Sequence, residues 1–310
     1  MSASTITGAR TASAGRAPAS PRRRTRWSPG LLFLAPSLLI LGVFVLWPIA
    51  QSFYYSLFDW TIGANSQKWL GLGNYVALTQ DPHFWNALGV TMVYTVITVV
   101  LLVVLGFLVA LALQGEGLIT RIVRSALFFP TIVSLVSIGL VWKFLLDPQI
   151  GLVGGLFDLI GAKPIAFLTD PSLALPSLIF VGVWKSVGFA MIIFVGGLKA
   201  VPAERYEAAR LDGTSRAQSV WFITLPSIRP TLLFATLILT IQSLQLFDLV
   251  YVMTGGGPLF ATDSLVNLLY RSGFVDYKTG YAAAISWVLF AIVMIISGIQ
   301  LRLFRYDDVD

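Results

Sequence analysis

The sequence predicts an all-α integral membrane protein with six transmembrane helices and both termini in the cytoplasm. Charged residues make up 12% of the chain and hydrophobic residues 56%, whereas about 25% of a soluble domain is charged. Such a chain lacks the polar side chains to cover itself in water, so lipid must be its solvent over much of its surface. Long apolar segments and an uneven distribution of Lys and Arg complete this prediction.

Six segments are apolar over roughly the 20 residues that a helix needs to cross the hydrocarbon core of a bilayer. The first is longer than the apolar region of a signal peptide and has no clear cleavage site after it, so we expect it to be retained. The expected spans are Leu31–Ala50, Leu88–Leu113, Ala126–Leu146, Leu175–Leu198, Pro230–Tyr251 and Tyr281–Leu303.

Basic residues set the orientation of these spans, because cytoplasmic loops carry an excess of Lys and Arg. With the N-terminus inside, fifteen of the 21 basic residues fall in cytoplasmic segments and four fall outside, while Lys143 and Lys185 lie within spans. Both termini are therefore expected in the cytoplasm. The same distribution accounts for the net charge of +6 without a nucleic-acid partner.

Residues 1–27 differ in composition from the rest of the chain. They are rich in Ser, Ala, Thr, Pro and Arg and have no apolar period, which predicts a disordered basic tail in the cytoplasm. The six-helix domain is expected over 28–310.

The chain has no cysteine and a single histidine, His83, which we expect at the surface. We find no spaced cluster of metal ligands and no catalytic constellation, so we expect no metal site and no enzyme activity.

Tryptophans lie near the expected outer edges of several spans. The four are Trp60, Trp69, Trp85 and Trp142. Interfacial anchoring by amphipathic rings is the simple interpretation, and stacking on a saccharide remains an alternative for one of them.

The connection between the expected fourth and fifth spans, residues 199–228, differs from every other loop. Pro202 suits the first turn of a short helix, and Glu207 falls near the positive end of that helix. Gly213 breaks the helical pattern where a sharp turn is expected, and a second short helix is expected over 215–222. The sequence thus predicts a helix–turn–helix bracket on the cytoplasmic face, suited to docking of a soluble partner.

This loop resembles the EAA loop of ABC importer permeases at every signature position and at the correct spacing. In that family the loop forms a coupling helix that inserts into a groove on the ATPase subunit. The resemblance therefore implies an ATPase-coupling role for Glu207, Ala208, Ala209, Gly213, Leu225 and Pro226.

The resemblance extends over about Leu31–Leu303, and Thr254–Pro258 is similar to the sugar-permease branch, which serves maltose-type, multiple-sugar and glycerol-3-phosphate importers. It implies a type I ABC importer permease fold. It also implies a second permease subunit, two ATPase subunits and an extracytoplasmic solute-binding protein as partners. No GxxxxGK[ST] phosphate loop occurs in the chain, so we expect no cofactor here, with ATP and Mg on the ATPase. The large periplasmic insertion of the maltose-type subunit is absent.

Polar side chains inside spans are costly in lipid and are therefore candidates for a substrate path. In the expected fifth span, Gln242, Gln245 and Asp248 are spaced by three and are predicted to share one helix face. Hydrogen bonding between helices is the alternative role. By resemblance to the maltose-type subunit, Gln242, Ser243 and Gln245 fall on a sugar-contacting stretch.

The expected fourth span contains a second candidate stretch. By the same resemblance, Trp184–Phe189 falls on another sugar-contacting stretch, in which Ser186 and Phe189 are the candidates. Lys185 lies deep in this span, where a lysine is expensive unless it is paired or faces water. It either attracts an anionic group of the cargo or pairs with Asp248.

These observations lead to one functional hypothesis and one alternative. The hypothesis is a multi-pass permease subunit in the cell (inner or plasma) membrane, surrounded by lipid, that moves a carbohydrate or glycerol-phosphate-type solute into the cytoplasm by ATP-driven alternating access. The alternative is a stand-alone secondary transporter or channel for a polar solute. That class needs ion-coupling carboxylates, and Asp248 is nearly the only one in the expected spans.

Overall fold

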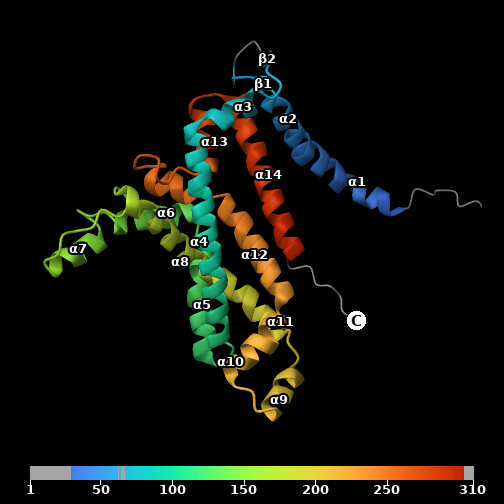
Figure 1. Ribbon diagram of the computed structural model, residues 1–310, viewed down its shortest axis with the longest axis vertical. Coiled ribbons are helices and arrows are strands. Elements are labelled where there is room, and N and C mark those ends of the chain that lie inside the picture. The colour runs from blue at the N-terminus through green and yellow to red at the C-terminus, as the bar shows by residue number, and fades with distance from the viewer. Residues whose placement is uncertain (1–28, 62, 64–66, 304–310) are drawn as a thin grey trace, which may run out of the picture. The chain divides into compact units, whose positions relative to one another are not determined.

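The computed structural model describes residues 29–61, 63 and 67–303, so the predicted basic tail over 1–27 lies outside the described residues. Helices and one small sheet form the described chain (Figure 1). The chain divides into two compact units, residues 1–49 and 50–310. Each unit is described by itself.

The first unit contains helix α1 (Pro29–Leu41) and a π-helical turn (Gly42–Leu46), after which helix α2 (Trp47–Ser56) begins and runs into the second unit. The stretch Phe33–Ser56 has a mean hydropathy of 2.2. A helix was predicted over Leu31–Ala50, and the observed one is a few residues longer at each end. Most side chains over 33–49 are exposed, as expected for a helix that faces lipid.

The second unit is a helical bundle with a small antiparallel sheet, in which Phe58 pairs with Trp69. Its elements are β1 (Phe58–Asp59), β2 (Lys68–Trp69), α3 (Gly73–Gln80), α4 (Pro82–Ala112), α5 (Leu118–Ile132), α6 (Leu135–Leu145), α7 (Leu152–Leu159), α8 (Pro171–Lys199), α9 (Ala203–Leu211), α10 (Arg216–Ser219), a π-helical turn (Val220–Thr224), α11 (Leu225–Ser227), α12 (Arg229–Leu244), a second π-helical turn (Val250–Thr254), α13 (Leu265–Tyr270), a third (Arg271–Val275) and α14 (Thr279–Leu303).

The two longest helices, α4 and α8, begin in the same way. Asp81 accepts a 2.8 Å hydrogen bond from the backbone N–H of His83, and Asp170 accepts one of 2.8 Å from that of Ser172. A proline follows each aspartate, which suits the first helical position because its missing N–H is not needed there. Hydrogen bonds from the Ser172 hydroxyl and N–H hold the pKa of Asp170 below its usual value.

Helix packing depends on small residues where backbones approach closely. A Cβ on Gly106 of α4 would lie 2.6 Å from the Cβ of Ala190 on α8. A Cβ on Gly188 of α8 would collide with the carbonyl group of Leu127 on α5. In lipid, where apolar burial gives little driving force, such close packing holds helices together.

The predicted third span, Ala126–Leu146, is wrong as a single helix. Helices α5 and α6 meet at an angle of 98° across a break of two residues, and Val133 and Ser134 have extended backbone conformations. Pro130 lacks a backbone N–H, and Thr131 to Val133 are three consecutive β-branched residues, which favour helices less than straight side chains do.

The predicted fifth span, Pro230–Tyr251, is also interrupted. Helix α12 ends at Leu244, and helical structure resumes at Asp248. No Pro or Gly lies between 231 and 254. The break is stabilised by a tertiary contact instead, because the buried hydroxyl of Ser264 donates a 2.6 Å hydrogen bond to the Leu246 carbonyl oxygen.

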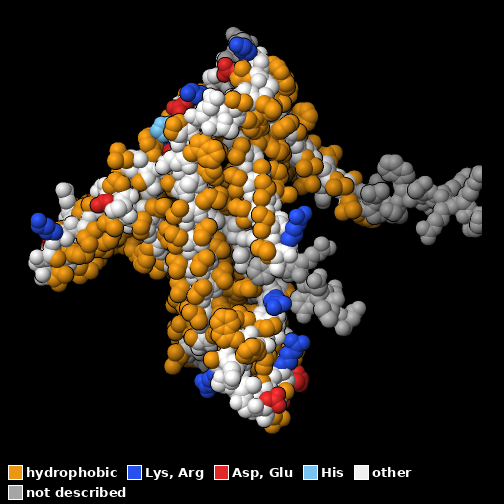
Figure 2. All heavy atoms as spheres, in the orientation of Figure 1, with side chains coloured by type: hydrophobic (Ala, Val, Ile, Leu, Met, Phe, Trp, Pro, Cys, Tyr) orange, Lys and Arg blue, Asp and Glu red, His pale blue; other side chains and the backbone are white. Residues whose placement is uncertain are grey.

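Within the described residues, four helices are long and apolar enough to cross a membrane, and two bent pairs meet the same criterion when each is counted as one span. The bent pairs are α5 with α6 and the segment 216–227 with α12. Hydrophobic side chains cover much of the visible face along α4, α5 and α14, and acidic side chains are visible near α3 and near α9 (Figure 2). This distribution fits a bundle with a lipid-facing middle and polar ends.

Candidate functional site

A cavity of about 400 Å³ lies among α4, α5, α8 and the broken end of α12. The structure brings all six predicted path residues to its lining. They are Lys185, Ser186, Phe189, Gln242, Ser243 and Gln245. Residues from two spans that are separate in sequence therefore surround one space.

The break in α12 changes how these side chains are arranged. Gln242 lies in the last turn of the helix, Gln245 follows it as the cap residue, and Asp248 lies beyond the break. The prediction that the three share one face of a continuous helix is therefore wrong. All three still line the cavity, because the residues that follow the end of α12 also lie along its wall.

Lys185 is half-buried and forms no ion pair with Asp248 at 4.0 Å or less, although both residues line the cavity. Its ammonium group donates a single long hydrogen bond of 3.4 Å to the carbonyl oxygen of Thr131. The alternative in which Lys185 pairs directly with Asp248 is not the arrangement in this structure.

Three polar residues of the lining were missed by sequence reasoning. Tyr94 and Thr98 come from α4, and Thr131 comes from the end of α5. Tyr94 and Thr98 are four residues apart on one face of an apolar span that also contains Thr91 and Thr95. That spacing was the signal that could have revealed them.

The predicted helix–turn–helix bracket is confirmed over α9 and the segment after it. Gly213 makes the turn with φ +72°, a left-handed conformation that side chains other than glycine rarely adopt. Ser215 then starts α10 with a reciprocal pair of hydrogen bonds to Gln218. The second helix extends through a π-helical turn to Ser227, five residues beyond its expected end.

Two side-chain contacts join α9 to the second half of the bracket. The Arg205 guanidinium donates a 2.9 Å hydrogen bond to the Ser227 hydroxyl, and the hydroxyls of Tyr206 and Thr224 lie 3.1 Å apart. The bracket is therefore cross-linked at two adjacent positions and leads directly into α12. In Figure 1 it lies at the end of α4 opposite α3.

The six predicted coupling residues all lie on this bracket. Glu207, Ala208 and Pro226 are exposed, and Glu207 has no ion-pair partner among the described residues. Ala209 is buried, at 5% exposure, and its carbonyl oxygen accepts a 2.7 Å hydrogen bond from the Thr214 hydroxyl. Leu225 is half-buried.

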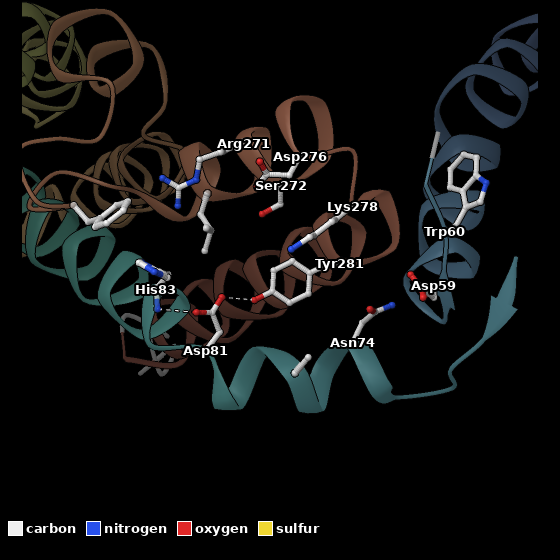
Figure 3. Close-up of a pocket in the computed structure, with 13 residues that line it drawn as sticks. Asp59, Trp60, Asn74, Asp81, His83, Arg271, Ser272, Asp276, Lys278 and Tyr281 are labelled. Carbon is white, nitrogen blue, oxygen red and sulfur yellow. Dashed lines mark hydrogen bonds between the residues drawn. The ribbon is translucent and has the colours of Figure 1, made fainter. Parts of the chain in front are cut away.

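A larger cavity of about 710 Å³ lies at the other end of α4, among α3, α4, the π-helical turn 271–275 and α14 (Figure 3). The Tyr281 hydroxyl donates a 2.6 Å hydrogen bond to Asp81, the same carboxylate that caps α4. Trp60 and His83 line this cavity. His83 is exposed, as expected, and the centroid of its ring lies 4.6 Å from that of Phe260.

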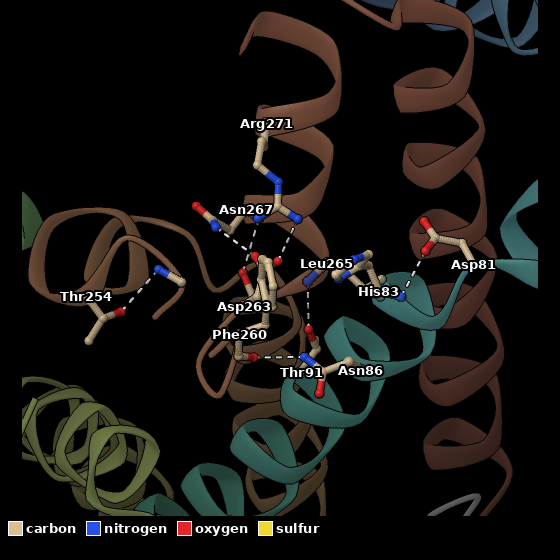
Figure 4. A network of polar contacts seen from close by, with 12 residues as sticks. Asp81, His83, Asn86, Thr91, Thr254, Phe260, Asp263, Leu265, Asn267 and Arg271 are labelled. Atoms are coloured by element: carbon tan, nitrogen blue, oxygen red, sulfur yellow. Dashed lines mark hydrogen bonds and ion pairs between the residues drawn. The ribbon is translucent and has the colours of Figure 1, made fainter. Parts of the chain in front are cut away.

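A buried polar network holds the loop before α13 (Figure 4). Asp263, at 1% exposure, accepts hydrogen bonds of 2.9 Å from Arg271 and 2.7 Å from Asn267. The Asn86 amide donates to the carbonyl oxygen of Phe260, and the backbone N–H of Leu265 donates to Thr91. These last two bonds tie the loop to α4. Within the described residues, no group of three or more His, Cys, Asp or Glu is placed to hold a metal ion.

The arrangement of apolar spans, an interrupted helix beside a polar cavity and a cross-linked bracket at one end defines a multi-pass membrane permease. Residues 103–306 match the family described as binding-protein-dependent transport system inner membrane component, and the chain belongs to this family.

Curated relatives and a solved structure agree with this assignment. The chain is 33% identical over 285 residues to the multiple sugar-binding transport system permease protein MsmF of Streptococcus mutans, covering 90% of this chain and 96% of that protein. It is 30% identical over 276 residues to the sn-glycerol-3-phosphate transport system permease protein UgpA of Agrobacterium fabrum, covering 87% and 92%.

Among solved structures, the fold is similar to a chain of a bacterial alginate ABC transporter in complex with an alginate pentasaccharide-bound periplasmic protein. The TM-score is 0.78 at 22% identity, covering 89% of this chain and 94% of that chain. The chain is accordingly an inner-membrane permease subunit of an ABC importer.

Proposed function

We propose that this permease subunit carries a carbohydrate or a glycerol-phosphate-type solute through the cavity between α8 and the end of α12. The observation that carries the proposal is the polar lining of that cavity, in which two glutamines, two serines and Lys185 come together inside otherwise apolar spans. Hydroxyl-rich solutes both donate and accept hydrogen bonds, and amide and hydroxyl side chains match both roles. The relatives that serve multiple sugars and glycerol-3-phosphate support the same cargo class.

In this proposal α5 with α6 counts as one span, and α12 with the helical segment after its break counts as another, which gives six spans with both termini in the cytoplasm. The bracket then lies on the cytoplasmic side, where positively charged loops are expected. Arg205, Arg210 and Arg216 on the bracket and Arg229 directly after it fit that placement.

We propose three kinds of protein partner for this chain. A second permease subunit completes the translocation path, and two ATPase subunits dock on the brackets through Glu207, Ala208, Ala209, Gly213, Leu225 and Pro226. An extracytoplasmic solute-binding protein delivers cargo to the opposite end, as the periplasmic protein in the alginate transporter complex supports. ATP and Mg bind on the ATPase subunits, so this chain itself needs no cofactor and catalyses no bond change. Movement of the bracket is transmitted to α12, and the cavity opens alternately to each side.

Co-purification with ATP-dependent uptake tests this proposal. A C-terminally tagged chain solubilised gently from native membranes is expected to bring with it an ATPase, a second permease and a binding protein. Uptake of the ligand of that binding protein is expected to stop when ATP hydrolysis stops, with the ion gradient held constant. Recovery of the chain alone, with uptake that follows the ion gradient, would favour a stand-alone secondary transporter and make Asp248 the residue to test.

A further inference from the structure

A cavity of about 630 Å³ lies between the bracket and the end of α4, and the coupling residues do not line it. Its polar lining includes two arginines, Arg210 before the Gly213 turn and Arg216 after it, together with Gln114. The cavity thus spans both arms of the turn.

The charge in this cavity is uncompensated. No carboxylate lines it, and among the described residues neither Arg210 nor Arg216 has a side-chain hydrogen bond or an ion-pair partner. Ion pairs elsewhere in the described chain join Lys199 to Glu116 and Arg271 to Asp263. Both arginines are exposed, and two cationic side chains that line one cavity together favour an anion beside them.

Hydroxyl groups brace the walls of the cavity. Thr214 donates a 2.7 Å hydrogen bond to the Ala209 carbonyl oxygen, and Thr224 donates one of 3.2 Å to that of Ser219. The Tyr206 hydroxyl lies 3.1 Å from that of Thr224. These bonds occupy the hydroxyl groups internally, so the guanidinium groups and the Gln114 amide remain as the donors available to a ligand.

We propose that this cavity binds a phosphate group. A guanidinium presents planar pairs of N–H donors that match phosphate oxygens, and the oxygens of one phosphate can accept from two guanidinium groups at once. Two sources supply this chemistry at the cytoplasmic face. One is the headgroup of an anionic phospholipid of the inner leaflet, and the other is a soluble phosphate.

The face of α9 that lines this cavity is separate from the face that carries Ala208. Tyr206 and Arg210, one turn apart, face the phosphate cavity, whereas Arg205 and Ala208 line a different cavity of about 740 Å³. A phosphate can therefore bind without covering the Ala208 face. Bonded to both guanidinium groups, it ties the two arms of the Gly213 turn together and stiffens the bracket. Any effect of this stiffening on transport rests on the proposed coupling role of the bracket, whereas phosphate binding itself does not.

Binding is measured on the full-length chain in two arms. In the first, the chain is held in nanodiscs of phosphatidylcholine and titrated with inorganic phosphate. In the second, no phosphate is added, and native mass spectrometry measures retention of phosphatidylglycerol from mixed nanodiscs. Each arm compares the natural chain with Arg210→Gln, Arg216→Gln and the double variant, and Arg229→Gln serves as the matched control because it removes a bracket-proximal guanidinium outside the cavity.

Binding in either arm is expected to weaken about tenfold in each single variant, because a charge-assisted hydrogen bond is lost, and to fall further in the double variant. Arg229→Gln is expected to bind as the natural chain does.

Binding in the first arm alone identifies a soluble phosphate, and binding in the second alone identifies a lipid. Equal binding by the double variant and Arg229→Gln, or no binding in either arm, overturns the proposal. In the latter case, loss of ATPase co-purification in the double variant would assign the two arginines to carboxylates of the ATPase instead. None of these readouts depends on transport, so the cargo proposal stands or fails separately.

Discussion

The hydroxyl of Ser264 donates a 2.6 Å hydrogen bond to the carbonyl oxygen of Leu246. This bond stabilises the break after α12, beside the cavity that Lys185 and Gln242 line. Ser264 is fully buried and also caps α13 by accepting from the backbone N–H of Asn267 at 3.2 Å. One side chain thus secures both the end of one helix and the start of another.

Replacing Ser264 with alanine is expected to destabilise the protein by about 1–3 kcal/mol, because a buried carbonyl oxygen loses its partner. Thermal unfolding of the purified chain measures this loss. Ser286→Ala is the matched control, since that hydroxyl bonds only to the Ala283 carbonyl oxygen of its own helix. Equal melting temperatures for the two variants would show that the Ser264 bond does not stabilise the break.

The cavity glutamines give a second prediction. Gln242→Leu and Gln245→Leu remove amide groups while keeping much of the side-chain size, so we expect KM for uptake to rise about tenfold for each, the cost of one hydrogen bond. Membrane levels of the protein are expected to stay unchanged. Gln149→Leu, in the turn after α6 and away from the cavity, is the control. A fall in the maximal rate with KM unchanged would place these residues outside the cargo site.

The Gly213 turn gives a third prediction, which depends on backbone conformation. A Cβ at this position meets no atom within 4 Å, so the cost of a side chain comes from φ +72°, and proline also removes the N–H of Gly213 that donates to the Arg210 carbonyl oxygen. We expect Gly213→Asn to keep most of the uptake, because asparagine tolerates the left-handed region, and Gly213→Val and Gly213→Pro to abolish it. Uptake in vesicles and membrane insertion are measured together. Full uptake by the valine variant would mean that the turn is not needed in this form.

The coupling assignment gives its own test at a neighbouring residue. Glu207 is exposed and unpaired among the described residues, so reversing its charge should not disturb folding. Glu207→Lys is expected to insert normally and to lose transport, because a partner surface that accepts a carboxylate now meets a cation. Glu204→Lys, one turn earlier on α9, is the control, because it makes the same change of charge elsewhere on the bracket. Transport at the natural level in Glu207→Lys would contradict the coupling role.

The buried pair of Asp263 and Arg271 leads to the fifth prediction. Arg271→Gln leaves a carboxylate buried without its ion partner, which is expected to cost about 3–5 kcal/mol of folding stability. Adding Asp263→Asn to the same chain removes the unpaired charge and is expected to recover part of this loss. A double-mutant cycle measured by thermal unfolding checks the coupling. If the losses of the two single variants simply add, the pair does not interact energetically.

Much of the fold and of the site could be predicted from local sequence features. Asp81 and Asp170, each followed by a proline, mark the starts of α4 and α8, and Gly213 marks the turn of the bracket. The break between α5 and α6 also has a local cause in Pro130 and the β-branched residues after it. The path residues Lys185 and Gln242 stand out because polar groups are rare in an apolar span.

The end of α12 could not be predicted in this way. The sequence from 231 to 254 contains no helix breaker, and the interruption depends on Ser264, which lies 18 residues beyond Leu246 and reaches it only in the folded chain. A tertiary hydrogen bond of this kind leaves no periodic signal. Tyr94 was missed for a different reason: its spacing from Thr98 was visible in the sequence, but a tyrosine in a span is equally compatible with packing between helices.

A helix that stops partway through a membrane leaves part of its main chain without partners. The last carbonyl oxygens of α12, near Leu244, have no following N–H groups of their own helix to bond, and the aligned peptide dipoles give this end a partial negative charge. The cavity beside it therefore attracts hydrogen-bond donors whatever side chains surround it. Substitutions in the lining can change which solute fits the cavity. The preference for hydroxyl and ammonium groups comes from the backbone, so it is expected in every related chain that keeps the break in α12.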